Sequence, residues 1–158
     1  LQANFFSWFT INGIKPNLFV IYILFIGLFG NRSMGVIYGA VVGIFLDLLY
    51  KTNVGINLAG LVLVGLLATL FNKNFSKDSR ITIMFMVFGT TIIFETITYL
   101  INYVVYSINV EVLSFIKILV VEVIYNILVT IIIYPAMQKF GYYIENEYKG
   151  NKILTRYF

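Results

Sequence analysis

Two acidic residues, Glu95 and Glu122, stand inside long apolar stretches of a chain that is otherwise poor in charge. Each belongs to a polar stripe at helical spacing: Thr91, Glu95, Thr98 and Asn102 in one stretch, and Glu122, Asn126 and Thr130 in another. Acids at membrane depth are costly and normally face the interior of a helix bundle. The two stripes therefore predict either a solute or proton pathway or hydrogen-bonded contacts that hold a bundle together.

A second pattern is a stripe of glycines at intervals of four, followed by an acid and by another glycine: Gly35, Gly39, Gly43, Asp47 and Gly55. Residues four apart share a helix face, and small residues let two helices approach closely in lipid. The stripe predicts either helix packing within the chain or a docking groove for the helix of a partner. Asp47 precedes Lys51 by four residues, which permits an ion pair, and Asp47 and Gly55 are expected to shape an outer turn.

The chain has no cysteine and no histidine, which removes thiol chemistry, sulfur-ligated metals and the commonest acid/base group at neutral pH. It also has no Gly-x-Ser-x-Gly elbow, no Walker loop and no cluster with metal-ligand spacing. We therefore predict no catalytic residue, no cofactor and no metal. The net charge of +4 is interpreted as a signal of membrane topology, not of nucleic-acid binding.

The elements that carry these patterns are membrane-spanning helices. Of the 158 residues, 60% are hydrophobic and only 11% are charged, whereas soluble domains have about 25% charged residues. A span needs about 20 mostly apolar residues, and Pro16 suits the first turn of a helix. The sequence predicts an all-α, polytopic bundle in one domain, 1–158, with spans at 16–31, 33–50, 54–72, 81–107 and 112–137.

The flanking segments and the charges predict how the bundle is oriented. Residues 1–14 are expected to be the end of an earlier span or an interfacial turn, and residues 138–158 a cytoplasmic tail on the membrane surface. One side of the membrane would hold eight cations and the other three: Arg32, Lys73, Lys77, Arg80, Lys139, Lys149, Lys152 and Arg156, against Lys15, Lys51 and Lys117. Cations concentrate on the cytoplasmic side, so the C-terminus is expected inside and a first helix before Leu1 is expected to be missing.

Three tyrosines, Tyr99, Tyr103 and Tyr106, form a stripe at the outer end of their predicted helix. Tyrosine is enriched where the bilayer meets water, because its ring is apolar and its hydroxyl is polar. The stripe therefore predicts an aromatic belt or a periplasmic face that binds a partner.

Several of these motifs occur in an order that resembles a known family. Asn-Gly-Ile-Lys-Pro-Asn-Leu at 12–18 leads into a short span, and a basic hairpin follows at Asn31-Arg32. The glycine stripe then ends in Asp47-Leu-Leu and leads to Val54-Gly55-Ile-Asn-Leu. Together these motifs resemble the rod shape-determining protein MreD of bacteria, and Leu1-Gln2-Ala3 resembles the end of that family's first helix.

The resemblance implies a multi-pass protein of the bacterial inner membrane, with six helices similar in arrangement to the substrate-binding S-components of energy-coupling-factor transporters. It also implies a non-enzymatic role in cell elongation. Such proteins bind the bitopic protein MreC, and through it MreB, RodA and a class B penicillin-binding protein. Neither nucleic acid nor a small-molecule substrate is expected.

Three functional hypotheses follow from the sequence. The first is this scaffold, in contact with membrane lipid and protein partners. The second is a small-solute-binding S-component, motivated by the size, the helix count and the stripes at Glu95, Glu122 and Asn126. The third is a proton-coupled carrier, which would need Glu95 or Glu122 for transport.

Overall fold

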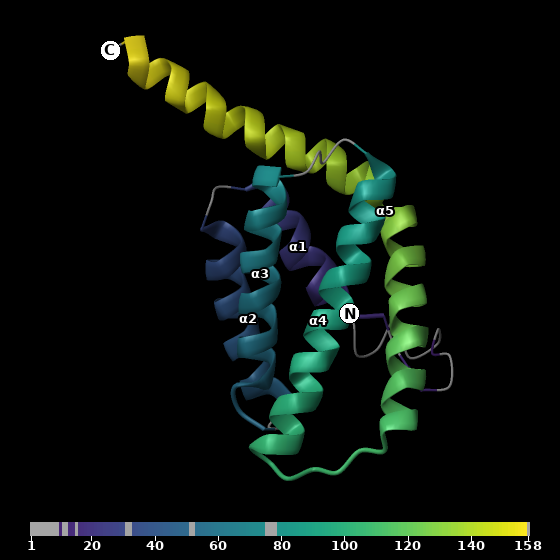
Figure 1. Ribbon diagram of the computed structural model, residues 1–158. Helices are drawn as coiled ribbons and strands as arrows, with labels where there is room; N and C mark the ends of the chain where they lie inside the picture. The colour runs from purple at the N-terminus through teal and green to yellow at the C-terminus, as the bar shows by residue number, and fades with distance from the viewer. Residues whose placement is uncertain are drawn as a thin grey trace.

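The structure is a computed structural model that describes residues 10, 13–14, 16–30, 33–50, 53–74 and 79–157. Its helices are α1 (Leu18–Phe29), α2 (Met34–Tyr50), α3 (Ile56–Asn74), α4 (Arg80–Val104) and α5 (Val112–Tyr157). In Figure 1, α2, α3, α4 and the first part of α5 run alongside one another, and α1 lies among them. The chain is an all-α helical bundle, as its composition predicted. Its two ends are called here the Asp47 end, where α2 finishes, and the Arg80 end, where α4 begins.

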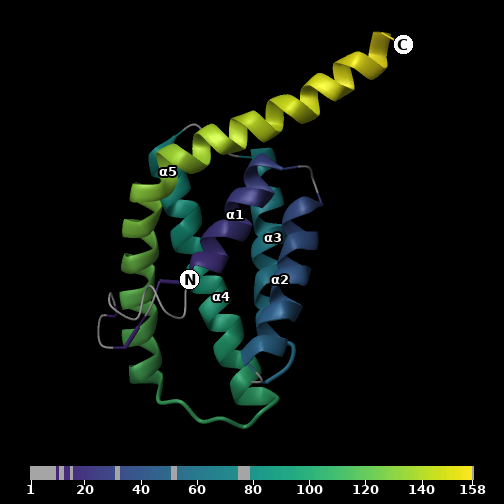
Figure 2. The ribbon, with the colours of Figure 1, turned by 180° about the vertical axis from the view of Figure 1, so that it is seen from behind.

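Among the described residues, three helices are long and apolar enough to cross a membrane, over Ile56–Lys73, Arg80–Val104 and Val112–Tyr143. By contrast, α1 has only 12 residues. At 1.5 Å per residue it is about 18 Å long, well short of the roughly 30 Å hydrocarbon core. Figure 2 shows that α1 begins beside the middle of α4 and α5 and runs toward the Arg80 end. The segment predicted as a span at 16–31 therefore contains a helix of about half the required length.

The start of α1 also differs from the sequence prediction. The helix begins at Leu18, with Asn17 as its N-cap, and the Asn17 side chain accepts a hydrogen bond from the Val20 amide. Pro16 lies before the cap and not in the first helical turn. Asparagine is among the strongest N-cap residues because its side-chain oxygen satisfies an amide that lacks a partner within the helix. This side chain therefore sets the boundary.

The apolar character of α1 on all sides follows from its central place. It packs against each of the other helices, and such a helix has no face left for polar residues. Six of its side chains are at most 2% exposed: Val20, Ile21, Ile23, Leu24, Phe25 and Leu28. These residues form the core together with buried positions of α3 and α4, including Leu61, Val64, Ile83 and Val87.

The last helix is longer than the predicted span. α5 continues through Pro135 to Tyr157, and Figures 1 and 2 show its second part running across the Arg80 end of the bundle. Proline removes a helical hydrogen bond and bends a helix. The second part passes close to α1, since a Cβ on Gly141 would lie 2.6 Å from a ring carbon of Phe29. Its position on a membrane surface stays a prediction, and residues 1–9 and 11–12 of the predicted first segment lie outside the described residues.

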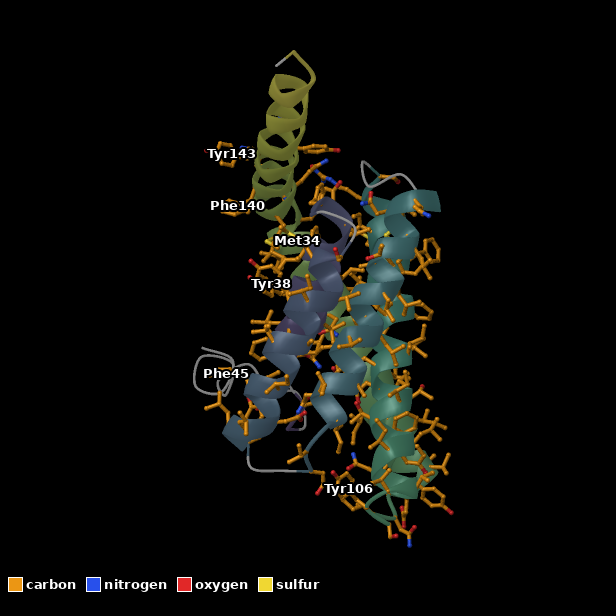
Figure 3. The ribbon with its side chains drawn as sticks, turned by 90° about the vertical axis from the view of Figure 1, so that its left-hand side faces the viewer. Met34, Tyr38, Phe45, Tyr106, Phe140 and Tyr143 are labelled. Atoms are coloured by element: carbon orange, nitrogen blue, oxygen red, sulfur yellow. The ribbon has the colours of Figure 1, made fainter. Side chains whose placement is uncertain are left out.

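The outward faces of the bundle are covered by large apolar side chains. On α2 these include Ile44, Phe45 and Leu48, which are 48%, 59% and 68% exposed. Figure 3 shows Tyr38 and Phe45 pointing away from the bundle, together with Phe140 and Tyr143 from α5. Such a surface suits hydrocarbon and not water. The protein is an integral membrane protein.

Candidate functional site

The predicted glycine stripe lies in the contact between α2 and α3. A Cβ on Gly39 would lie 2.5 Å from the carbonyl oxygen of Leu61, and one on Gly43 would lie 2.5 Å from the Cα of Leu58. Real Cβ atoms do not approach backbone atoms this closely, so only glycine allows the two helices to meet. In the structure α3 therefore fills the groove that the sequence offered either to this chain or to a partner.

Two further small residues join this contact, and the sequence analysis missed both. A Cβ on Gly35 would lie 2.8 Å from the Cα of Gly27 on α1 and 3.0 Å from the carbonyl oxygen of Gly65 on α3. Three helices thus meet at glycines near one level of the bundle. Neither Gly27 nor Gly65 belongs to a repeat of glycines at intervals of four, so periodicity gives no signal for either.

Asp47 is bound by the beginning of α3. Its Oδ2 accepts hydrogen bonds from the amides of Gly55 at 2.9 Å and Leu58 at 3.2 Å. Its Oδ1 accepts from the amide of Asn57 at 3.1 Å and from the Asn57 side chain at 3.0 Å. The side chain is only 2% exposed. Because the N-terminus of a helix carries unpaired amides and a partial positive charge, it stabilises a carboxylate.

This arrangement gives Asp47 a different role from the predicted ion pair. Its carboxylate already has four hydrogen bonds from α3 and the turn before it, while Lys51 lies outside the described residues. Gly55 contributes to the turn through its positive φ of 97°, which costs glycine little. Asn57, which the sequence analysis did not single out, contributes two of the four hydrogen bonds.

Two more hydrogen bonds tie α4 to the same turn. The Asn53 side chain donates to Oδ1 of Asn102 at 3.1 Å, and the Tyr106 hydroxyl donates to the carbonyl oxygen of Val54 at 2.7 Å. The predicted polar residue Asn102 therefore lies at the Asp47 end and away from the middle of the bundle. Together these contacts fix the connection between α2 and α3 against the end of α4.

Two tyrosines of the predicted stripe contact each other, because the rings of Tyr99 and Tyr103 stack with their centroids 6.4 Å apart. Tyr99 packs its ring against Phe115 with the ring centroids 4.4 Å apart, and its hydroxyl donates to the carbonyl oxygen of Val110 at 3.3 Å. Tyr106 is bonded to Val54, as described above. Tyr103 is 53% exposed. Within the described residues, two of the three therefore hold the end of α4 in place.

A buried polar cluster lies in the middle of the bundle, where α1 begins between α4 and α5. Oδ1 of Asn126 accepts a hydrogen bond from the Asn17 amide at 2.7 Å, and Nδ2 of Asn126 donates to Oγ1 of Thr91 at 3.0 Å. Thr130 donates to the Asn126 carbonyl oxygen. The two predicted stripes therefore face each other, and Asn126 connects three helices while being fully buried.

The two predicted acids belong to this same cluster. The carboxyl groups of Glu95 and Glu122 are joined by a hydrogen bond, and the Asn17 side chain is also hydrogen-bonded to Glu122. Glu122 is 6% exposed, and its Oε1 has no hydrogen-bond partner in the structure. Oγ1 of Thr98, one helical turn from Glu95 on α4, is also buried and has no hydrogen-bond partner. This cluster thus retains unused oxygen acceptors.

Asn17 is the member of the cluster that sequence analysis missed as a site residue. It caps α1, donates its amide to Asn126 and bonds Glu122. The Pro16-Asn17-Leu18 sequence is a helix-start signal, and it could have indicated the cap. The bond from residue 17 to residue 126 has no local signal, because it spans 109 residues of chain.

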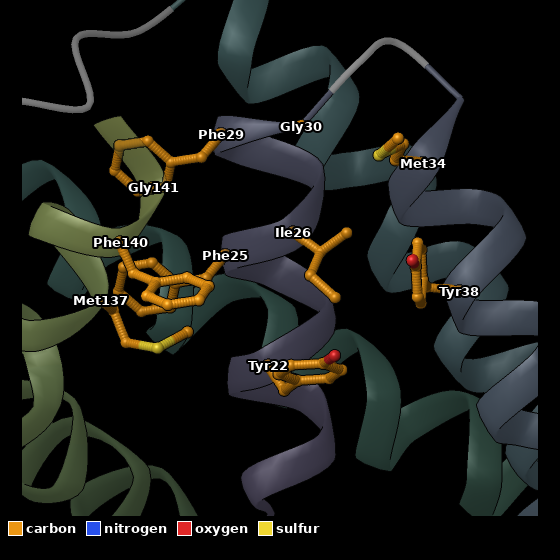
Figure 4. A pocket seen from close by; sticks show the side chains of 10 residues that line it. All are labelled: Tyr22, Phe25, Ile26, Phe29, Gly30, Met34, Tyr38, Met137, Phe140 and Gly141. Carbon is orange, nitrogen blue, oxygen red and sulfur yellow. The ribbon is translucent and has the colours of Figure 1, made fainter. Parts of the chain in front are cut away.

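A separate apolar groove of about 520 Å³ lies between α1, α2 and the second part of α5. Figure 4 shows the side chains that line it, among them Phe25 and Ile26 from α1, Tyr38 from α2, and Met137 and Phe140 from α5. None of the predicted intramembrane polar residues lines this groove. An S-component needs a closed cavity into which several polar groups point. This groove is instead lined mainly by apolar and aromatic side chains.

These observations define a class of protein: a polytopic integral membrane bundle, packed through glycines and cross-linked by buried polar side chains. The family model described as rod shape-determining protein MreD matches residues 1–144. The chain belongs to this family, and membership implies a role in rod-shape determination. No curated protein and no solved structure matches the chain, so the similarity to S-components stays a prediction. No group of three or more potential metal-ligating side chains occurs among the described residues.

Proposed function

We propose that the chain is a non-enzymatic scaffold of the rod complex in the bacterial inner membrane. It binds MreC, and through MreC it connects MreB with RodA and a class B penicillin-binding protein. The observation that carries this proposal is the family match over residues 1–144. Catalysis would need a reactive constellation, and the polar side chains of the described bundle are instead engaged mainly in bonds between helices.

The partner surface is the outward face of α2 together with the turn at the Asp47 end. The opposite face of α2 is filled by α3 along its glycines, so a partner helix meets the exposed side chains Ile44, Phe45 and Leu48. The four hydrogen bonds to Asp47 hold the adjacent turn in one conformation. A surface that is ordered before binding loses less conformational entropy when a partner docks.

Site-specific cross-linking tests this surface without a background, because the chain has no cysteine. Phe45→Cys and Leu48→Cys place a thiol on the outward face of α2, and Phe88→Cys and Ile132→Cys place one on the equally apolar faces of α4 and α5. With a thiol-reactive photo-cross-linker in native membranes, MreC should be captured from α2 and not from α4 or α5.

The possible outcomes test the scaffold function and the assignment of α2 as the partner surface separately. If MreC is captured only from α4 or α5, the scaffold function stands and the assignment of α2 is wrong. If MreC neither co-purifies with the unmodified chain in mild detergent nor is captured from any position, the scaffold proposal itself is wrong.

The proposed orientation places the C-terminus in the cytoplasm, in line with the excess of cations on that side. A Lys152→Cys variant should resist a membrane-impermeant thiol reagent in intact spheroplasts and react after permeabilisation. A Val110→Cys variant, at the opposite end of the bundle, should react in intact spheroplasts. Labelling of residue 152 in intact spheroplasts would overturn the orientation.

A further inference from the structure

We propose that Glu95 and Glu122 together bind one monovalent cation, a proton or a sodium ion, in a buried site between α1, α4 and α5. The site lies where α1 begins, and its walls include Asn17 and Thr98. This inference is independent of the scaffold function, because it concerns the interior of the bundle and not its partner surfaces.

The first argument is the pairing of two carboxyl groups with each other. An ionised carboxylate only accepts hydrogen bonds, so a bond between two carboxyls requires a proton on one of them. Two ionised carboxylates in contact at membrane depth would repel each other and would each lack hydration. The bond from Asn126 to Thr91 sets the register of α4 and α5 and places Glu95 opposite Glu122 one helical turn further on. This pair therefore needs a positive charge between its two carboxyl groups.

The second argument is the set of unused oxygen atoms. Oε1 of Glu122 belongs to a side chain that is 6% exposed, and it has no hydrogen-bond partner. Oγ1 of Thr98 is likewise buried and without a partner. Buried polar groups are normally satisfied. Carboxylate and hydroxyl oxygens are also the ligands that hard cations take.

The third argument concerns the other charged and titratable groups on the helices around the pair. α1 is apolar where it meets the site. On α4, the Tyr99 hydroxyl is bonded to Val110. On α5, Lys117 is exposed and lines an outer pocket together with Ile14, while Tyr125 is half-buried. Within the described part of the chain, therefore, no basic side chain faces the two carboxyls.

The polar cluster continues from the two acids toward the Arg80 end with side chains that already have hydrogen-bond partners: Asn126 bonds Thr91, and Thr130 bonds the Asn126 carbonyl oxygen. Beyond Thr91, the next turn of α4 is apolar, with Val87 fully buried and Met86 3% exposed. Both residues pack into the core that α1 fills. Toward the Asp47 end the face of α4 continues with Thr98 and Asn102. The acceptors without a hydrogen-bond partner, Oε1 of Glu122 and Oγ1 of Thr98, therefore lie on the Asp47 side of the bonded cluster.

The bound cation stabilises the start of α1. The Asn17 side chain bonds Glu122 while its amide bonds Asn126, so α1 is attached at a point next to the cation. Removing the cation would leave two facing carboxylates beside this attachment. We therefore expect occupancy of the site to hold the beginning of α1 between α4 and α5.

The test uses the purified full-length chain in nanodiscs at neutral pH and has two readouts. Infrared spectroscopy detects the C=O stretch of a protonated carboxylic acid, and thermal unfolding in NaCl or choline chloride at equal ionic strength detects sodium binding. The variants are Glu95→Gln/Glu122→Gln and the single variant Glu122→Gln. Glu111→Gln, at the exposed start of α5, is the matched control.

A bound proton predicts a carboxylic acid band that the double variant loses and Glu111→Gln retains. Bound sodium predicts a Tm that rises with the logarithm of the sodium concentration, with no such rise in choline or in the double variant. If the double variant does not fold, Glu122→Gln and the unmodified chain still decide the result.

Several outcomes would overturn the proposal. One is an unmodified chain that shows neither the acid band nor a sodium-dependent Tm. Another is a signal that persists unchanged in the double variant. A third is an acid band that is absent from the unmodified chain and appears in the Lys15→Met variant. The positive charge that balances the two carboxyl groups would then come from Lys15 and not from a bound cation.

Discussion

Two regions of the bundle hold helices together in different ways. The contact between α2 and α3 depends on glycines and on Asp47, whose carboxylate accepts four hydrogen bonds. The contact among α1, α4 and α5 depends on long polar side chains in the middle of the bundle, and Oε1 of Glu122 has no partner there. In the first region the helices are close-packed and the Asp47 oxygens have hydrogen-bond partners. The second region retains an oxygen atom that is free to bind a ligand.

The difference shows how stability and binding are divided in this membrane protein. Lipid gives no hydrophobic drive for helix pairing, so helices associate through close packing and hydrogen bonds. A glycine contact excludes every other occupant, because the two backbones touch. A polar contact between side chains leaves oxygen atoms that a small cation can use. We therefore expect mutations in the first region to lower the free energy of unfolding. Mutations of Glu95 and Glu122 should instead change how the protein responds to protons or sodium ions.

The largest effect is expected for Gly39→Leu. The new side chain would collide with the backbone of α3 at Leu61. Overpacking typically costs about 1–3 kcal/mol and occasionally more, and a clash with backbone, which cannot rotate away, belongs at the upper end of this range. The free energy of unfolding, measured by SDS titration in mixed micelles, should fall accordingly. Gly89→Leu on α4 is the control, because a Cβ there meets nothing within 4 Å. Equal losses in the two variants would show that the α2–α3 contact has no special role.

A smaller loss is expected for Asp47→Ala. It removes four hydrogen bonds and leaves the amides of Gly55, Asn57 and Leu58 without this partner. The free energy of unfolding should fall by about 2–3 kcal/mol, the range for lost bonds to a buried charged group. Glu111→Ala removes an exposed acid at the same end of the bundle and should change little. An unchanged stability in Asp47→Ala would mean that water replaces the carboxylate without loss.

The smallest effect is expected for Asn126→Leu. The change removes the bonds to the Asn17 amide and to Thr91, and hydrogen bonds between membrane helices contribute about 0.6–1.7 kcal/mol. The same SDS titration measures the loss, and hydrogen exchange of the first amides of α1 should rise. Asn146→Leu makes the same change on the exposed second part of α5 and is the control. A loss as large as that of Gly39→Leu would remove the distinction between the two regions.

The sequence predicted most of the helices and several of the contact faces, but it did not predict which faces meet. Helical spacing placed Gly35, Gly39 and Gly43 on one side of α2, yet only the fold shows that α3 covers them. Spacing permitted an ion pair of Asp47 with Lys51, which lies outside the described residues, but it gave no sign that Asp47 accepts hydrogen bonds from the start of α3. Those hydrogen bonds depend on the geometry of the turn at Gly55, which no residue spacing specifies.

The ends of the helices were the least predictable feature. Pro16 favoured a helix start at residue 16, whereas α1 begins at Leu18 because Asn17 caps it. Pro135 favoured a span that ends near residue 137, whereas α5 continues to Tyr157. A proline bends a helix without ending it when the backbone on each side can keep its remaining hydrogen bonds.

The amino-acid sequence alone determined that the protein is an α-helical membrane protein and which helix faces are small or polar. These are local properties, since apolarity and helical periodicity can be evaluated from neighbouring residues. Only the tertiary structure decided that α1 begins midway between α4 and α5 and that Asn17 joins Asn126 and Glu122. Contacts between residues more than 100 positions apart depend on how complementary helix surfaces fit together, and no local pattern specifies that fit.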